Sequence, residues 1–312
     1  MLPADPVLPA LVAAHERGVQ AVLAECGVRA SVRSVRVLRH HPGSRCVLEV
    51  QTGDGRLAIK AFRRDPADRA ATLTRLAAAG LAQPRGPSVT VLAGYDGRLA
   101  CLVLEWLAGE PAVELLAGGR GARVGALAAQ WLAAAATVGP GGLDSYGAVP
   151  MLSDLARWCE AITNADPTLG ERAVALINRL QDDPPPRGRP GLLHGSFSVN
   201  HLLELGDGPG VLDWDEPRHG PVELDAGAFL ASLRRYAGQQ PARSAGAVEV
   251  EVEVEAADAL VTSAGDVLDP LALAWYRRAA LVKHAKHACK LHAAGWRRLA
   301  DELLRTAGRA WP

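Results

Sequence analysis

The sequence feature that most constrains the fold is the stretch from Leu192 to Asp215, LLHGSFSVNHLLELGDGPGVLDWD. An apolar pair leads into His-Gly and a short polar loop, and a second apolar pair leads into a Gly-rich turn. Apolar runs bounded by turn residues predict a loop followed by a short hairpin. The hairpin ends in Val-Leu-Asp-Trp-Asp, so it presents carboxylates where an apolar strand stops. The stretch therefore predicts a catalytic loop followed by a carboxylate-bearing strand end.

The composition is that of a globular protein. The chain has 312 residues, of which 49% are hydrophobic, enough for one large domain or two lobes with a sizeable core. Its formal net charge is zero, which argues against a general binder of nucleic acids or of anionic membranes. No apolar run approaches the length of a membrane span. We therefore expect neither nucleic acid nor membrane among the partners.

The start of the chain and its cysteines predict a cytoplasmic protein. No basic region precedes the apolar residues of the opening segment MLPADPVLPALVAAHERG, as it would in a secretory signal. The five cysteines are odd in number and widely spaced: Cys26, Cys46, Cys101, Cys159 and Cys289. Buried free thiols in a reducing compartment are the simplest account of them.

The first third of the chain predicts a leading helix and a small antiparallel sheet. Residues 5–26 have helical spacing, and Gly27 ends the helix. Apolar or alternating runs separated by turn residues predict five strands: 31–40, 46–50, 57–62 and one on each side of the turn at 95–97. The spacing of Leu73 and Leu76 predicts a helix over 65–79, inserted between the third and fourth strands.

From Ala108 onward the chain becomes rich in Ala and Leu and predicts a helical region. The expected helices are 113–116, 122–138, 152–162, 169–180, 224–236 and 271–307, the last broken near Gly295. The segment 184–190, PPPRGRP, predicts a stiff connector. Residues 248–258 alternate Val and Glu as a strand would. We interpret them as helix, because an isolated strand in a helical lobe has nothing to pair with.

The stretch from Leu192 to Asp215 resembles the core of the aminoglycoside phosphotransferase and choline kinase family, which has the protein-kinase-like fold. That family has His-Gly-Asp, then Asn after four further residues, and then an Ile-Asp-Trp or Ile-Asp-Phe strand. The resemblance covers nearly the whole chain and implies an α+β fold with two lobes. A small antiparallel, β-rich lobe over 1–107 would bind the nucleotide. A larger helical lobe over 108–312 would carry the catalytic loop and the substrate site.

Lys60 lies inside the apolar strand LAIKAF, where a charge needs a partner. In the resembled family this Lys holds the α- and β-phosphates of the nucleotide. The structural alternative is a Lys that extends from the strand edge into solvent. Kinase-like folds usually pair this Lys with a Glu on the following helix. No Glu occurs between Phe62 and Leu81, so Asp68 is the nearest candidate partner.

Asp213 follows the apolar pair Val211-Leu212 and precedes Trp214. In the resembled family this Asp binds the magnesium ion that bridges the phosphates. A hard cation requires oxygen ligands, and a carboxylate at a strand end supplies one. Asp215 is either a second ligand or a solvated neighbour.

Ser196 stands where the family has its catalytic Asp, which accepts or orients the proton of the substrate hydroxyl. A Ser hydroxyl is not a useful base near neutral pH. General-base catalysis contributes roughly 10²- to 10⁴-fold, whereas phosphoryl transfer depends mainly on positioning and electrostatics. The substitution therefore predicts slow transfer rather than none. His194 could replace the base, but we favour the bracing role that this His has in the family.

His201 stands at the position of the family's magnesium-binding Asn. Neutral imidazole is a poor ligand for magnesium, which prefers oxygen. Asn200 is one residue early and would reach the metal only with a different loop path. Asp225, in VELDAGAFL, matches a late Asp of the family that hydrogen-bonds the catalytic loop.

Two function hypotheses follow. The first is a phosphotransferase that uses ATP or another nucleoside triphosphate with Mg²⁺ and acts on a hydroxyl of an antibiotic, amino alcohol, sugar or natural-product peptide. The adenine edge would then contact the segment joining the lobes, at Glu105 and Trp106. The second is a pseudokinase that binds a nucleotide, metabolite or peptide in the same cleft and serves a partner protein.

The acceptor cannot be chosen from the charges in the sequence. Sites for polycationic aminoglycosides are usually acidic. Residues 248–255 carry four Glu, but the C-terminal helical region is basic: Lys283, Lys286 and Lys290 alternate there with His284, His287 and His292. The two neighbouring histidines could hold a metal. We favour a basic stripe that faces solvent or the cleft, because no carboxylate is close in sequence.

Overall fold

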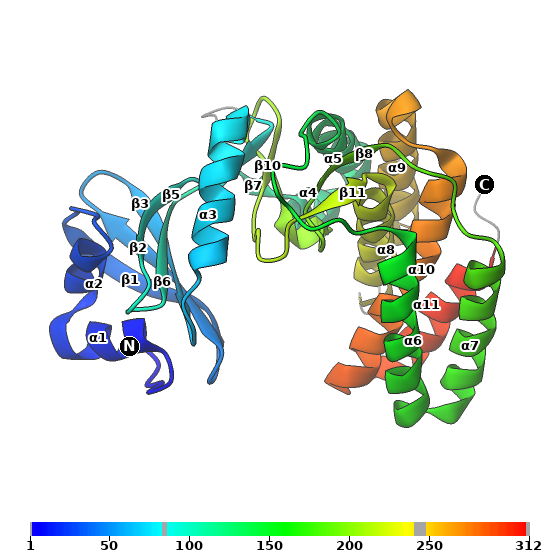
Figure 1. The fold of residues 1–312 in the computed structure, drawn as a ribbon, viewed down its shortest axis with the longest axis horizontal. Helices are drawn as coiled ribbons and strands as arrows, with labels where there is room; N and C mark the ends of the chain where they lie inside the picture. Colours follow the sequence, from blue (N-terminus) through cyan, green and yellow to red (C-terminus); the bar gives the residue numbers. More distant parts are fainter. Residues whose placement is uncertain (1, 83–85, 240–247, 310–312) are drawn as a thin grey trace. The chain divides into compact units, whose positions relative to one another are not determined.

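The computed structural model describes residues 2–82, 86–239 and 248–309. The chain divides into two compact units. The first unit contains Met1–Gly109 and Gly210–Asp215, and the second contains Glu110–Pro209 and Glu216–Pro312. The first unit holds an antiparallel sheet and the second is mainly helical, which is the predicted α+β fold (Figure 1).

The sheet of the first unit has five antiparallel strands in the order β1-β2-β3-β6-β5. The strands are β1 (Val32–His41), β2 (Arg45–Thr52), β3 (Arg56–Phe62), β5 (Leu92–Asp96) and β6 (Cys101–Glu105). They confirm the five predicted strands. Each turn lies where the sequence offers Gly or Asp, and the apolar runs between them give one side of the sheet a continuous buried face.

Helices α1 (Pro9–Arg17) and α2 (Val19–Glu25) cover one face of this sheet. Their apolar side chains share a core with Leu48 of β2, Ile59 of β3 and Val103 of β6. The sequence predicted one helix here. The structure has two, because Gly18 adopts φ 84°, a left-handed conformation that interrupts the helix and suits glycine.

Helix α3 (Ala67–Leu76) lies between the third and fourth strands of the sheet in sequence and continues as a π-helical turn at Ala77–Leu81. The short strand β4 (Ser88–Val89) follows and pairs in parallel with β10 (Pro209–Val211). This pairing attaches the Gly210–Asp215 segment to the first unit, although the whole of Glu110–Pro209, which belongs to the second unit, precedes it in the chain.

The second unit is built from eight helices and short strand pairs over its described residues. The helices are α4 (Ala112–Ala117), α5 (Gly121–Ala135), α6 (Ala148–Ala165), α7 (Pro167–Asp182), α8 (Glu223–Gln239), α9 (Val248–Ala264), α10 (Pro270–Leu291) and α11 (Trp296–Gly308). Strand β7 (Glu110–Pro111) pairs with β9 (Leu202–Glu204), and β8 (Pro190–Leu193) pairs with β11 (Arg218–Pro221). Helices α6, α7, α8, α10 and α11 contribute to one apolar core.

The alternating segment of Val and Glu is helical, as predicted, and forms the start of α9. Its buried side is set by Val252, Ala256 and Leu260, which are four residues apart and therefore share one helix face. This face approaches α5 closely. A Cβ on Gly121 would lie 2.4 Å from the Val252 carbonyl oxygen, and one on Gly125 would lie 2.1 Å from that of Ala256.

The expected break in the C-terminal helical region is also present. His292 at φ 48° ends α10, and Gly295 at φ 76° precedes α11. Among the described residues, no helix combines the length and apolar character needed to cross a membrane.

Candidate active site

Strand alternation determines the direction of the Lys60 side chain. Ile59 and Ala61 belong to the core beneath α1 and α2, so Lys60 points to the opposite face of the sheet. On that face it lines a small pocket together with Leu102 and Leu104 of the neighbouring strand β6. The Lys60 side chain is only 16% exposed, so its charge depends on partners inside the pocket.

Asp213 is presented by a tight turn directly after β10. Its backbone has φ 68°, in the left-handed region where Asp and Asn are better tolerated than most residues. The buried Trp214 fixes the turn, because its indole Nε1 donates a hydrogen bond to the Val211 carbonyl at 3.0 Å. The Asp215 amide donates to the Asp213 carbonyl at 2.9 Å. Two carboxylates therefore leave the strand within three residues.

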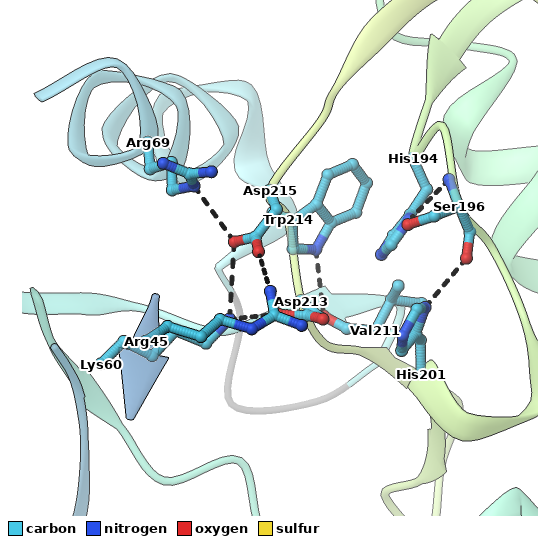
Figure 2. Close-up of polar contacts among 10 residues, drawn as sticks. All are labelled: Arg45, Lys60, Arg69, His194, Ser196, His201, Val211, Asp213, Trp214 and Asp215. Atoms are coloured by element: carbon cyan, nitrogen blue, oxygen red, sulfur yellow. Dashed lines mark hydrogen bonds and ion pairs between the residues drawn. The ribbon is translucent and has the colours of Figure 1, made fainter. Parts of the chain in front are cut away.

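Lys60 and two arginines neutralise these carboxylates (Figure 2). Lys60 Nζ forms an ion pair with Asp213 Oδ1 and lies 3.8 Å from Asp215 Oδ1. Arg45 Nη1 of β2 lies 2.8 Å from Asp215 Oδ2, and Arg69 Nε of α3 lies 3.3 Å from Asp215 Oδ1. Three cationic side chains therefore surround two carboxylates, and this local excess of positive charge favours an anion.

The donor set fits a magnesium-bound nucleotide. Carboxylate oxygens are the ligands that Mg²⁺ prefers. Asp213 and Asp215 already balance one positive charge, the ammonium of Lys60. No group of three or more His, Cys, Asp or Glu able to hold a metal occurs in the ranges that the structure describes. Magnesium in nucleotide sites commonly has one or two carboxylate ligands and completes its coordination with phosphate oxygens and water, and the two carboxylates of this pocket fit that pattern.

The second unit carries the loop that the sequence predicted to be catalytic, and Asp225 at the start of α8 holds it. The Asp225 carboxylate accepts hydrogen bonds from the backbone N–H of His194 and, at 3.1 Å, from that of Gly195. Gly195 has φ 77°, and a Cβ there would lie 2.4 Å from the Glu216 carbonyl oxygen. The loop path therefore requires both the buried acid and glycine.

Burial raises the pKa of Asp225 to about 7. The hydrogen bonds from the loop amides and the positive charge of Lys283 lower this pKa, but they do not offset the loss of hydration. The acid is thus a structural support of the loop, and its charge depends on pH close to neutrality.

The Ser196 hydroxyl is engaged with a side chain of its own loop (Figure 2). His194 Nδ1 accepts from the Ser196 backbone N–H at 3.3 Å and lies 3.2 Å from Ser196 Oγ. The accepting nitrogen carries no proton, so the hydroxyl donates to it. His194 is fully buried, and both contacts order the loop. The geometry thus gives His194 a bracing position.

His201 is also fixed by the loop. Its Nδ1 donates to the Ser196 carbonyl at 3.0 Å, and its ring stacks on that of His194 with 5.1 Å between centroids. Because a carbonyl only accepts hydrogen bonds, the proton lies on Nδ1, and Nε2 of the neutral ring carries the lone pair.

The other predicted site residues are not among those that line the Lys60 pocket. Asp68 is exposed in the first turn of α3, whereas the ion pairs found for Lys60 join it to Asp213 and Asp215. Glu105 and Asn200 are also exposed. Trp106 is half-buried, with the Arg56 guanidinium 4.6 Å from its ring centroid.

Sequence reasoning missed Arg45 and Arg69, which hold Asp215. The absence of Glu from α3 was a sign that the usual Lys–Glu ion pair of kinase-like folds is replaced by another arrangement of charges. Nothing in the sequence distinguishes Arg69 from the arginines near it, because its role depends on which face of α3 meets the sheet.

The sequence matches the model of a phosphotransferase enzyme family over residues 37–260. This match covers more than half of the chain. The comparison with curated proteins gives no match.

Solved structures share the fold over nearly the whole chain. Macrolide 2'-phosphotransferase MphH from Brachybacterium faecium is 20% identical, with 92% of this chain and 97% of that chain covered and a TM-score of 0.56. The amicoumacin kinase hAmiN, solved with AMP-PNP, Ca²⁺ and Ami, is 13% identical, with 92% and 93% covered and a TM-score of 0.62. Aminoglycoside 2'-phosphotransferase-IIIa, solved with GDP, is 12% identical, with 89% and 93% covered and a TM-score of 0.58.

The chain therefore belongs to the phosphotransferase enzyme family, as the predicted resemblance to aminoglycoside phosphotransferases implied. At these identities the solved structures establish a kinase-like fold and not a substrate.

Proposed function

We propose that the protein binds a nucleoside triphosphate with a divalent cation and transfers the γ-phosphate to a hydroxyl of a small molecule or peptide. The observation that carries this proposal is the pocket in which Lys60 and Asp213 meet with a surplus of positive charge. Two of the solved relatives, bound to GDP or to AMP-PNP with Ca²⁺, support a nucleotide and a divalent metal as ligands.

Each residue of the pocket has a role in this proposal. Lys60 exchanges Asp213 for the α- and β-phosphates when the nucleotide enters, which frees the Asp213 carboxylate to hold the cation. The cation would neutralise charge that develops on the phosphates. Asp215 stays paired with Arg45 and Arg69 and orients these arginines toward the anionic ligand.

The loop of the second unit is proposed to position the acceptor rather than to deprotonate it. Ser196 is not a base, and the Nδ1 lone pair of His194 is already used by Ser196. Transfer is therefore expected to be slow. His201 and Asn200 remain predicted contributors to the metal site, as Asp68, Glu105 and Trp106 remain predicted contributors to the nucleotide site. All five cysteines are buried free thiols, which supports the predicted cytoplasmic location.

A second candidate function is a pseudokinase that binds nucleotide without transferring phosphate. The engagement of the Ser196 hydroxyl by His194 favours it, because the loop as it stands offers no group with the basicity of a carboxylate. Release of ADP that depends on an acceptor hydroxyl separates the two functions, since only the phosphotransferase shows it.

The binding step is tested by thermal unfolding with and without Mg-ATP. At a ligand concentration near 100 times Kd, wild type should gain roughly 4 °C in Tm. Lys60→Met, which keeps the apolar stem, and Asp213→Asn, which suits the left-handed backbone, should each lose most of this gain. Arg63→Met changes an exposed cation close to the same strand and serves as the control. No nucleotide-dependent gain in wild type would exclude both functions.

A further inference from the structure

Helices α8 and α10 carry a group of basic side chains that the proposed nucleotide site does not use. The group consists of Arg235 on α8 and Lys283, His284, Lys286 and His287 on α10, and we call it the basic cluster. The chain has only four lysines, and three of them lie within the last turns of α10. The cluster is therefore a local concentration of lysine in a protein that otherwise uses arginine.

The side chains of the cluster are packed against rings and partly withdrawn from water. The rings of His284 and His287 lie 6.3 Å apart, and Lys283 Nζ lies 5.8 Å from the Trp158 ring centroid. All five side chains of the cluster are only partly exposed. A stripe of charges that merely faces solvent would not be packed in this way.

Two nitrogen atoms of the cluster are buried without a hydrogen-bond partner among the described residues: Nε of Arg235 and Nδ1 of His284. The ring of His284 already has a hydrogen bond to the Ala228 backbone, so Nδ1 of the neutral ring is an acceptor and Arg235 Nε–H is the unpaired donor of the two. An unpaired buried donor costs free energy, so native structures nearly always pair such a group. The Arg235 guanidinium is an obligatory donor and cannot be satisfied by another cation. The missing partner of Arg235 Nε is therefore a hydrogen-bond acceptor, preferably one with a negative charge.

The electrostatic surroundings also call for an anion. Burial, together with the charges of Arg235, His287 and Lys283, lowers the pKa of His284 to about 3. Burial likewise lowers the pKa of His287 to about 4, helped by Lys286 and Lys283. Two carboxylates that interact with the cluster's lysines already have other partners: Asp225 interacts with Lys283, and Asp154 interacts with Lys286. Asp225 holds the loop amides, and Asp154 binds Tyr146 and Arg157.

The cluster lies beside the support of the Ser196 loop within the second unit. The positive charge of Lys283 lowers the pKa of Asp225. The Asp225 carboxylate in turn accepts hydrogen bonds from the backbone of His194 and Gly195. A group bound at the cluster would therefore lie near the loop that carries Ser196. A metal ion is a poor occupant, because lysines and an arginine repel it and the described residues offer no set of three ligands.

We propose that the basic cluster binds an oxyanion, either a carboxylate or a phosphate monoester, carried by the acceptor of the phosphotransferase. The inference rests on the proposed function, because an acceptor exists only if phosphate is transferred, and it deepens that function by naming an acidic substrate class. A polycationic aminoglycoside is the opposite of what this cluster accepts.

Small anions test the proposal directly in the full-length Lys60→Met variant, where the nucleotide pocket has lost its phosphate-binding ammonium. Inorganic phosphate and acetate are titrated separately, with NaCl adjusted to hold ionic strength constant. At about ten times Kd, at least one of them should raise Tm by roughly 2–4 °C. A gain with phosphate alone identifies a phosphate monoester, and a gain with both identifies a carboxylate as an accepted group.

Arg235→Gln should abolish the gain, whereas Arg298→Gln, an exposed arginine of α11, should preserve it. The bound anion should also raise the pKa of His284, seen as a shift of its ring proton resonance that is assigned with His284→Gln. In a chain that keeps Lys60, Arg235→Gln should retain the gain in Tm from Mg-ATP, which shows that this substitution leaves the protein folded.

Three results would overturn the proposal: no gain from either anion, a gain that Arg235→Gln leaves intact, or a larger gain from polycationic kanamycin. Because the nucleotide pocket is already disabled in the anion titrations, failure here is distinct from failure of the Mg-ATP test, which depends on Lys60 and Asp213.

Discussion

Ser196 is the residue at which the sequence predicts the largest departure from the chemistry of the resembled family. Its hydroxyl donates toward His194 Nδ1, and the same nitrogen accepts the Ser196 amide. Both contacts shape the loop and neither provides a base. A carboxylate at this position would supply basicity and would still leave the amide contact to His194 in place.

Ser196→Asp should therefore raise the rate of phosphate transfer, or of ATP hydrolysis if no acceptor is found, by roughly 10²- to 10⁴-fold. The rate is measured as ADP release at saturating Mg-ATP. Ser198→Asp, two residues later in the same loop, is the control for added negative charge and should have little effect. An unchanged rate in Ser196→Asp would favour the pseudokinase.

Asp225 gives the protein a pH dependence near neutrality. Its pKa is raised to about 7 in the folded state, above the ordinary value of 3.8, so the folded state holds a proton that the unfolded state has released. The stabilisation from this proton is complete below about pH 4 and is lost as pH rises through about 7. The histidines with lowered pKa values, His284 and His287, act in the opposite direction below about pH 6.5.

Comparison with Asp225→Asn isolates this contribution, because both proteins contain the same histidines. The free energy of unfolding of wild type minus that of the variant should fall by about 1.4 kcal/mol per pH unit between pH 5 and 6.5 and level off above pH 8. Urea unfolding at half-unit pH steps measures it. A constant difference across this range would mean that Asp225 is already ionised at pH 5.

At the residue scale, the sequence predicted the side chains whose neighbours are distinctive. Lys60 interrupts an apolar strand, and Asp213 follows one, so the residues on either side make each of them conspicuous. Arg45 and Arg69 are not conspicuous, because many arginines lie near them in the sequence. Their importance arises from contacts with Asp215, which is distant in the chain, and local patterns carry no information about such contacts.

Among the secondary-structure elements, α3 departs most from the usual kinase-like arrangement. It offers Arg69 to the pocket where a Glu is expected. The Lys60 ammonium is balanced instead by the strand-end carboxylates. Positive charge is thereby added to the pocket rather than cancelled, and this suits a ligand as anionic as a nucleoside triphosphate.

Arg69→Met should weaken Mg-ATP binding roughly 10-fold, because one charge-assisted contact is lost. Arg75→Met removes an exposed arginine of the same helix and should leave Kd unchanged. Isothermal titration at low and high salt measures both, and the salt dependence of Kd should be smaller in Arg69→Met. Tighter binding in that variant would instead mean that Arg69 competes with the cation for Asp215.

The elements themselves were largely predictable, since apolar periodicity decides most of them. The five strands and the break between α10 and α11 agree with the sequence pattern. The break at Gly18 and the π-helical turn at Ala77–Leu81 were not predicted, because a glycine inside a helical pattern does not reveal whether its φ is positive. The strand β4 was missed because its pairing partner, β10, is distant in sequence.

At the scale of the whole molecule, the first unit is discontinuous in sequence. Its sheet and Lys60 come from Met1–Gly109, whereas Asp213 and Asp215 come from Gly210–Asp215. Neither segment alone supplies both the ammonium and the carboxylates. The predicted boundary near residue 107 was placed where the composition of the chain changes. Composition gives no sign that the short later segment Gly210–Asp215 belongs to the first unit.

Binding of Mg-ATP should therefore slow amide hydrogen exchange in both of these segments together. A ligand held by Lys60 and Asp213 stabilises β2, β3 and Gly210–Asp215 together, so amide exchange should slow in all three to a similar extent. Peptide-resolved mass spectrometry on the full-length chain measures this, with Lys60→Met as the control in which the protection disappears. Protection of β2 and β3 without Gly210–Asp215 would show that the nucleotide binds without Asp213 and would remove the cation from the proposed site.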